Sequence, residues 1–294
     1  MANISFKNVD LNIIKQIMAY YSNYEVTQHD KNKKNVFQKD GITITIYHTN
    51  TVLWQGPNAI RAAERFFPSK EKNEPSQKLA IAYNTPNIIG NDEVGVGDLF
   101  GPLVVCATSF TKENAQILTT LPIKDSKKLR DDVILTLAPQ IKELVSYSIV
   151  IINNETYNTL FNKYHNSHII KAQGHNQALI NLTAKLNQHQ AIYIDQFVNP
   201  KKYFEYLQDQ KNVIKENVNF LTHGEEQILA IACSAILARA TFLAEIKKLE
   251  NKFNIVLPLG ASESTKQLGK KYKKMFPLEQ YHQFIKDHFN LEPK

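Results

Sequence analysis

Residues 87–110 read NIIGNDEVGVGDLFGPLVVCATSF. Two adjacent carboxylates, Asp92 and Glu93, follow a short apolar run and precede a glycine-rich turn and a second apolar run. The pattern predicts that both acids lie at the end of a buried strand, where a carboxylate is costly to desolvate unless a positive group lies beside it. Because the motif contains no lysine or arginine, it indicates a metal ion. The alternative is a tight turn in which Asp92 caps the backbone.

Further acids fall at the ends of other predicted elements. Asp195 ends the apolar run 191–194, and Glu225 and Glu226 precede a segment, 228–246, with the apolar periodicity of a helix. Both glutamates are therefore expected in or next to the first turn of that long helix. Sites in α/β folds lie at such element ends, and carboxylate oxygens suit Mg²⁺ or Mn²⁺. The sequence thus predicts a two-metal hydrolytic site.

Together these residues resemble a known family, the type 2 ribonucleases H, which contains ribonuclease HII and ribonuclease HIII. The resemblance rests on DEVGVGD at 92–98, KDSKKL at 124–129, YID at 193–195 and SAILAR at 234–239. These motifs span about residues 88–260 in the family's order. Ribonuclease HIII is the closer match, because the turn reads Gly-Val-Gly rather than Gly-Arg-Gly and because an extra N-terminal domain is present.

The resemblance implies a metal-dependent endonuclease that hydrolyses the RNA strand of RNA/DNA hybrids, leaving 3′-hydroxyl and 5′-phosphate ends. It implies four catalytic, metal-binding acids that hold two Mg²⁺ or Mn²⁺ ions: Asp92, Glu93, Asp195 and Glu225. Counting back from the SAILAR segment favours Glu225 over Glu226, and we expect Glu226 to be a solvated residue that favours the helix dipole.

The glycine turn is the candidate for reading the sugar. The backbone of Gly95, Val96 and Gly97 can approach a ribose closely and so detect the 2′-hydroxyl that distinguishes RNA from DNA. Because Val96 departs from the arginine of ribonuclease HII, long RNA stretches are the expected substrate. Ribonuclease HII-like excision of single ribonucleotides from duplex DNA is the alternative. A hybrid-binding protein without catalysis and a nucleotide-binding protein are further alternatives, although the glycine spacing matches neither a Rossmann turn nor a P-loop.

Other polar residues are candidates for contact with the substrate backbone. Ser126 and Lys127 can hold a phosphate at a helix N-terminus, although Ser126 is equally suited to be the N-cap. The remaining candidates lie before or within the helix predicted near 168–188: Lys163, Asn166, Lys171, His175 and Asn176. For His175 the alternative is a surface histidine that pairs locally.

The net charge of +7 predicts a polyanionic partner, here an RNA/DNA hybrid. Residues 1–86 carry 11 basic and 7 acidic side chains, and residues 239–294 carry 11 and 6, whereas the middle segment carries 13 and 15. The candidate acids thus lie in the one acidic segment, between two basic ones. Five C-terminal lysines are candidates for phosphate contact, with a solvated helix face as the alternative: Lys266, Lys270, Lys271, Lys273 and Lys274.

The bulk composition excludes several classes of protein. Hydrophobic residues make up 43% and charged residues 21%, as in ordinary globular proteins. The sequence has no uninterrupted run of 18 apolar residues and its first residues lack a signal-peptide pattern, so we expect a cytoplasmic protein with no membrane partner. We also expect a monomer. Cys106 and Cys233 lie in apolar stretches and are expected to be reduced core residues.

The order of elements predicts an α/β fold, a ribonuclease H-like mixed sheet flanked by helices, over residues 80–294. Strands are expected near 87–92, 101–110, 146–152, 191–195 and 216–221. Helices are expected near 126–144, 168–188, 200–210 and 225–250, followed by loops and one or two short basic helices.

Residues 1–67 predict a small N-terminal α/β domain that binds substrate, and the family resemblance implies the TATA-binding-protein fold for it. Asp40-Gly41 between alternating runs is a strong hairpin signal, with another strand near 52–55 and helices near 9–23 and 58–67. The alternation predicts one apolar sheet face and one polar face. The polar face is the candidate duplex-binding surface, with plain solvent exposure as the alternative: Lys39, Thr43, Thr45 and Tyr47. The polar segment 68–79 is the predicted linker.

Overall fold

The computed structural model describes residues 3–27, 30–67, 82–123, 129–186, 188–189 and 191–291. Two compact units, residues 1–80 and 81–294, make up the chain, and each has its own hydrophobic core. The predicted linker at 68–79 and the candidate phosphate contacts Ser126 and Lys127 lie outside the described residues.

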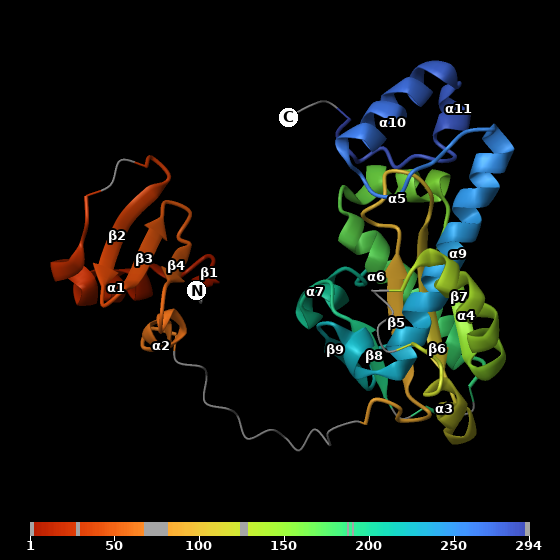
Figure 1. Ribbon diagram of the computed structural model, residues 1–294, viewed down its shortest axis with the longest axis horizontal. Helices are drawn as coiled ribbons and strands as arrows, with labels where there is room; N and C mark the ends of the chain where they lie inside the picture. The colour runs from red at the N-terminus through yellow and green to blue at the C-terminus, as the bar shows by residue number, and fades with distance from the viewer. Residues whose placement is uncertain are drawn as a thin grey trace. The chain divides into compact units, whose positions relative to one another are not determined.

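The N-terminal unit is an antiparallel sheet with the strand order β1-β4-β3-β2 (Figure 1). Its strands are β1 (Asn3–Phe6), β2 (Lys33–Lys39), β3 (Ile42–Tyr47) and β4 (Val52–Gln55). Its helices are α1 (Leu11–Tyr21), the one-turn η1 (Ser22–Tyr24) and α2 (Ala59–Glu64). Asp40 and Gly41 join β2 to β3 with φ angles of 49° and 74°, as a two-residue hairpin turn requires, so the predicted hairpin is confirmed. The four-residue strand β1 was not predicted.

One face of this sheet packs on the helices, and the other face was predicted to be polar. The structure corrects two of the four residues that were assigned to the polar face. Ile44 and Ile46 are fully buried in the core that α1 covers, and Thr43 and Thr45 point away from it. Thr45 is only 4% exposed, so the centre of the face predicted to be polar is partly covered. Lys39 lies on the helix side instead, with its ammonium 4.6 Å from the centre of the Tyr24 ring. The resemblance to the TATA-binding-protein fold stays a prediction.

The C-terminal unit is built on a mixed sheet with the order β7-β6-β5-β8-β9. The central strand β5 (Ile89–Val94) pairs antiparallel with β6 (Leu103–Ser109) and parallel with β8 (Ile192–Asp195). The outer strands are β7 (Ser146–Ile152) and β9 (Val218–Leu221). All five predicted strands are therefore confirmed. Continuous apolar runs suit the inner strands, because helices cover both of their faces.

Helices cover the two faces of this sheet, as predicted (Figure 1). One face packs against α3 (Lys112–Leu118), α4 (Asp131–Leu144) and α9 (Leu229–Phe253). The other face packs against α5 (Asn154–Tyr164), α6 (Ser167–Thr183) and α7 (Pro200–Glu205). The tail contains α10 (Glu263–Met275) and α11 (Leu278–Tyr281). The short helices α3 and α5 were not predicted.

The long C-terminal helix begins later than predicted. Residues Gly224–Gln227 form a separate turn, α8, after which Ile228 is extended with φ −133° and ψ 116°. Helix α9 then starts at Leu229. Glu225 and Glu226 therefore lie in a one-turn helix of their own rather than in the first turn of the long helix.

Helix α9 is long and apolar enough to span a membrane by length and composition. However, 67% of that stretch is buried inside the fold, where α9 packs on β5 and β6. The core helix of a globular protein meets the same criterion, so this helix is weak evidence for a membrane span.

Candidate active site

The sheet brings the four predicted acids to one edge. Asp92 and Glu93 lie in β5, and Asp195 ends the neighbouring parallel strand β8. Because parallel strands end at the same edge, these carboxylates meet there. The backbone N–H of Gly224 donates to Asp195 Oδ1 at 2.8 Å, which fixes α8 against β8. Glu225 follows directly, 1% exposed, and its charge acts on Asp92.

Asp92 and Glu93 point to opposite faces of the sheet, because successive strand residues alternate. Gly90, two residues before Asp92, packs against the backbone of α9, so Asp92 lies on that face. Glu93 instead contacts α6 on the other face. Both acids nevertheless line one cavity of about 310 Å³, together with Asp195. The end of a single strand therefore supplies carboxylate oxygens from both of its faces.

This crowding strongly affects Asp92. Burial raises the pKa of Asp92 well above its usual range, and the charges of Glu93, Asp195 and Glu225 raise it further. The backbone N–H of Glu93, which donates to Asp92 Oδ1 at 2.7 Å, opposes the shift. A divalent cation among these oxygens would favour the ionised form of Asp92 and so lower its pKa. A donor set made only of carboxylates suits Mg²⁺ or Mn²⁺.

This crowding predicts that Asp92→Asn stabilises the metal-free protein. A folded-state pKa above the unfolded value favours folding at low pH, and that contribution is lost as the pH rises through the folded pKa. At neutral pH the burial of this carboxyl group among three other acids therefore destabilises the fold relative to low pH. We expect the variant to raise Tm by about 2–4 °C in EDTA at pH 7.5, and by less near pH 4. Calorimetry of both proteins, with the exposed Asp132→Asn as control, measures this. An unchanged or lower Tm would mean that the carboxyl group of Asp92 does not destabilise the metal-free fold.

Glu93 has two partners that the sequence motif does not contain, a lysine and a histidine. Lys171 Nζ donates to Glu93 Oε1 at 2.8 Å, and His175 Nε2 lies 2.9 Å from Oε2. The two partners lie four residues apart on α6 and so on one helix face. Burial raises the pKa of Glu93, but these two contacts outweigh it and hold the pKa below the usual range. The motif itself contains no lysine or arginine, but α6 brings Lys171 to Glu93, so the absence of a basic residue from the motif is not by itself evidence for a metal at Glu93.

The structure places several predicted substrate contacts away from solvent. His175 is fully buried, so the alternative of a surface histidine is wrong, and Lys171 is 6% exposed. Both side chains contact Glu93 rather than open surface. Asn176 is 3% exposed and holds the backbone of Asn212 and Ile214 at 2.8 and 3.0 Å.

The other two residues of this group are more accessible. Lys163 is exposed on α5, and its ammonium lies 4.8 Å from the centre of the Tyr164 ring. Asn166 is half-buried and caps α6 by accepting from the N–H of His168 at 2.9 Å. Neither residue lines the cavity that contains the acids.

The glycine turn differs from its predicted role at one position. Gly95 is buried with φ 104°, and a Cβ there would lie 2.3 Å from the carbonyl oxygen of Pro102. The fold therefore requires a glycine at position 95. Gly97 is exposed, and a Cβ there would have nothing within 4 Å. Close approach by a substrate is therefore available at Gly97 rather than at Gly95.

The cavity also contains a charged pair that sequence reasoning missed. Arg239 on α9 forms two hydrogen bonds with Asp131 at the start of α4, at 3.0 and 3.2 Å. The sequence signal that could have indicated Arg239 as a residue of the site was its position at the end of the SAILAR motif. A larger cavity of about 690 Å³ lies apart from the acids in the C-terminal segment. Three of the candidate phosphate lysines line it: Lys270, Lys273 and Lys274.

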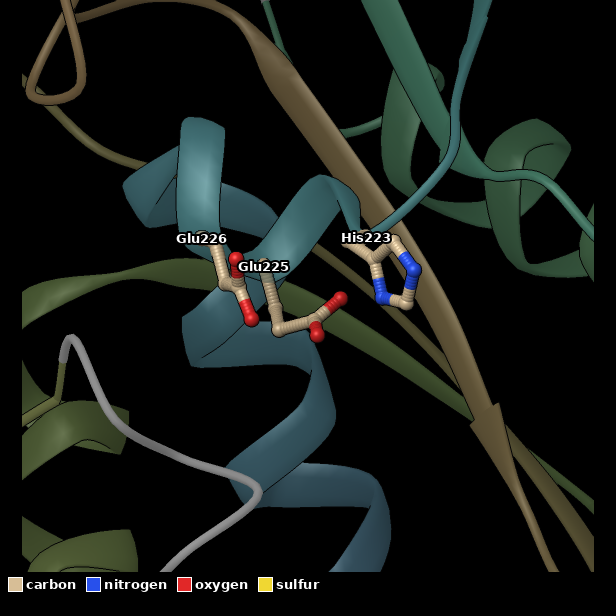
Figure 2. Close-up of side chains that lie close together, drawn as sticks. All are labelled: His223, Glu225 and Glu226. Atoms are coloured by element: carbon tan, nitrogen blue, oxygen red, sulfur yellow. The ribbon is translucent and has the colours of Figure 1, made fainter. Parts of the chain in front are cut away.

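A second group of potential metal ligands lies on α8. Ligand atoms of His223, Glu225 and Glu226 all lie within 4.8 Å of one another. Figure 2 shows Glu225 between the other two side chains, all three projecting from this turn. Glu225 is buried, whereas His223 and Glu226 are exposed. The buried position next to Asp195 favours Glu225 as the fourth acid of the site. The exposed residues His223 and Glu226 are alternative metal ligands.

We therefore predict that Glu225→Gln lowers kcat by roughly a hundredfold or more, whereas Glu226→Gln lowers it by less than about threefold. The two residues differ by about 100° around the turn, so only one can point toward Asp92. Steady-state cleavage at saturating Mg²⁺ compares them directly. A larger loss in Glu226→Gln would shift the fourth ligand by one residue and favour the exposed pair.

Comparison with known proteins identifies the family of the chain. The family model "Ribonuclease HII" matches residues 89–292, and the model "Domain of unknown function (DUF3378)" matches residues 6–79. A ribonuclease HIII of Bacillus cereus is 37% identical over 258 residues, which cover 84% of this chain and 83% of the relative.

Solved structures of related ribonucleases match this chain over almost its whole length. Bst-RNase HIII in complex with Mn²⁺ matches with a TM-score of 0.70 and 28% identity, covering 99% of this chain and 96% of that one. Aquifex aeolicus RNase H3 matches with a TM-score of 0.57 and 26% identity, covering 98% and 100%. The chain belongs to the ribonuclease HII family, in which its relatives include ribonucleases HIII, and it is a ribonuclease H.

Proposed function

We propose that this ribonuclease H is an endonuclease that cuts the RNA strand of RNA/DNA hybrids. The observation that supports this proposal best is the meeting of four carboxyl groups at the ends of β5 and β8, with Asp92 under strain from the other three. Homology to ribonucleases HIII over 84% of the chain supports the same activity.

The donor set fits two divalent ions, Mg²⁺ or Mn²⁺. Four carboxyl groups face one lysine, Lys171, so the cluster carries an excess of negative charge. When bound, such ions activate water for in-line attack and stabilise the leaving oxygen, which leaves 3′-hydroxyl and 5′-phosphate ends. That Bst-RNase HIII was solved with Mn²⁺ supports the fit.

The side chains have distinct roles in this proposal. Asp92 is central, because its charge interacts with all three other acids. Asp195 and Glu225 complete its side of the sheet, and α8 holds them in register through the Gly224 N–H. Glu93 supplies oxygen from the opposite face, held by Lys171 and His175, which we assign to positioning Glu93 rather than to the substrate.

Substrate contacts are proposed around this centre. The backbone of Gly95, Val96 and Gly97, with Gly97 exposed, is the proposed reader of the ribose. The domain predicted at residues 1–67, within the N-terminal unit, is proposed to bind the duplex. We propose that the protein acts as a monomer in the cytoplasm.

Three duplexes of the same sequence test the substrate assignment: a full RNA/DNA hybrid, a DNA duplex with one ribonucleotide, and plain DNA. We expect cleavage of the hybrid at many positions, at least about tenfold slower cleavage at the single ribonucleotide, and none of DNA. Preferred cleavage at the single ribonucleotide would favour the ribonuclease HII-like alternative. Binding of the hybrid without cleavage of any duplex would favour a non-catalytic protein.

A further inference from the structure

The loop that carries the glycine turn is held by a distant part of the chain. Gly101 N–H donates to the carbonyl of Phe284 at 3.0 Å, and Lys286 N–H donates to the carbonyl of Leu99 at 2.9 Å. Phe100 and Ile285 form the bridge between these bonds. The C-terminal segment after α11 therefore pairs with the loop between β5 and β6 as a short antiparallel ladder.

The side chain of Lys286 adds a second connection to the same loop. It is fully buried, and its ammonium donates to the carbonyl oxygens of Asp98, at 2.9 Å, and of Gly101. Gly101 O also accepts from Asn154 Nδ2 on α5 at 2.9 Å. Lys286 thus joins the two ends of the segment 98–101, and Asp98 directly follows the exposed Gly97.

A buried lysine at this position destabilises the fold unless its hydrogen bonds compensate for the lost hydration of the ammonium group. Burial lowers the pKa of Lys286 to about 7, and the charge of Asp98 opposes this shift only in part. An apolar side chain of similar volume would avoid the desolvation of an ammonium. It would also leave two backbone carbonyls with fewer donors, and their loop would lose its fixed geometry.

We propose that Lys286 is a positioning residue that sets the conformation of the glycine turn and thereby the discrimination of RNA from DNA. This inference rests on the proposed function, in which the turn reads the ribose. Among the described residues the ammonium donates to the carbonyls of Asp98 and Gly101 and lies 5.7 Å from the centre of the Tyr157 ring. Its effect on substrate therefore passes through the backbone of Asp98 to Gly97.

The test measures kinetics and binding preference in Lys286→Met, a substitution of similar length without donors. We expect KM for the hybrid to rise roughly tenfold while kcat changes by less than about threefold, because the contact with the ribose is already made in the ground state. In metal-free buffer, the ratio of Kd for plain DNA to Kd for the hybrid is expected to fall by a similar factor.

Two further variants sharpen the test. Asn154→Ala removes the other side-chain donor to Gly101 O and is expected to change the ratio in the same direction by a smaller factor. Lys252→Met removes an exposed lysine that bonds Gln283 in the same region, and it is expected to change neither KM nor the ratio.

A well-folded Lys286→Met protein with unchanged KM and unchanged binding ratio would overturn the proposal. Should this variant fail to fold, an unchanged ratio in Asn154→Ala would overturn it instead. Failure of the wild-type protein to cleave hybrid would refute the proposed function. The metal-free binding ratio would then still test the role of Lys286, so the two failures are distinguishable.

Discussion

Asp92→Asn is expected to lower kcat on an RNA/DNA hybrid on the order of a thousandfold, with Kd for the hybrid changed by less than about threefold. Asp92 is the acid whose charge interacts with Glu93, Asp195 and Glu225, so a neutral amide there weakens the whole set of oxygen donors. Affinity for a duplex depends mainly on basic side chains elsewhere. Single-turnover cleavage and fluorescence anisotropy separate the two quantities.

The matched control for this prediction is Asp132→Asn. Asp132 is an exposed acid on α4 that pairs with Arg130 outside the cavity, so its loss should leave kcat unchanged. Asp195→Asn is expected to behave as Asp92→Asn does. Near-normal turnover by either active-site variant at saturating Mg²⁺ would exclude the proposed metal site.

Removal of the N-terminal unit is the second large effect that we expect. A protein that starts near Lys78 retains all four candidate acids and the core of the C-terminal unit, which is separate from the N-terminal core. It loses 10 basic and 7 acidic side chains, a net charge of +3, and the proposed duplex-binding face. We therefore expect KM for the hybrid to rise by at least about tenfold, while kcat at saturating substrate changes much less.

Salt dependence distinguishes lost phosphate contacts from a damaged fold. The slope of log Kd against log salt is expected to become shallower by about one for each phosphate contact removed. The circular dichroism of the truncated protein serves as the folding control. An unchanged KM and salt slope would mean that residues 1–67 serve a purpose other than substrate docking.

Local patterns were enough to predict the strands and the meeting of the acids. The apolar runs before Asp92 and Asp195 are short, β-rich and bounded by turns, and parallel pairing of their strands follows from the intervening helices. For this reason all five strands of the catalytic sheet were predicted, with Asp92 and Asp195 at strand ends. The choice of Glu225 over Glu226 rested on the family resemblance instead.

Long-range contacts explain what could not be predicted. Lys171 and His175 lie about 80 residues from Glu93 in sequence, and nothing local to the β5 motif indicates that α6 packs beneath it. Their four-residue spacing showed that they share a helix face, but not which face. Similarly, Lys286 reaches a carbonyl 185 residues away, which only the tertiary fold reveals.

The break before α9 depends on a tertiary contact that the apolar periodicity does not reveal. Apolar residues continue through 228–232 with helical spacing, so the pattern predicts a continuous helix. In the structure Ile228 is extended and Gly224 donates its N–H to Asp195, which turns α8 toward the site. A tertiary hydrogen bond to a functional carboxylate thus prevails over helical propensity at this point.

The most direct test of the central claim is analysis of product ends from a hybrid whose RNA strand is labelled, incubated with Mg²⁺, with Mn²⁺ or with EDTA. The proposed carboxylate site predicts cleavage of the RNA strand alone, only with a divalent metal, and products with 5′-phosphate and 3′-hydroxyl ends. Undiminished cleavage in EDTA would contradict it, because the reaction would then need no divalent metal. Products with 2′,3′-cyclic phosphate ends would also contradict it, because the nucleophile would then be the substrate's own 2′-hydroxyl rather than water.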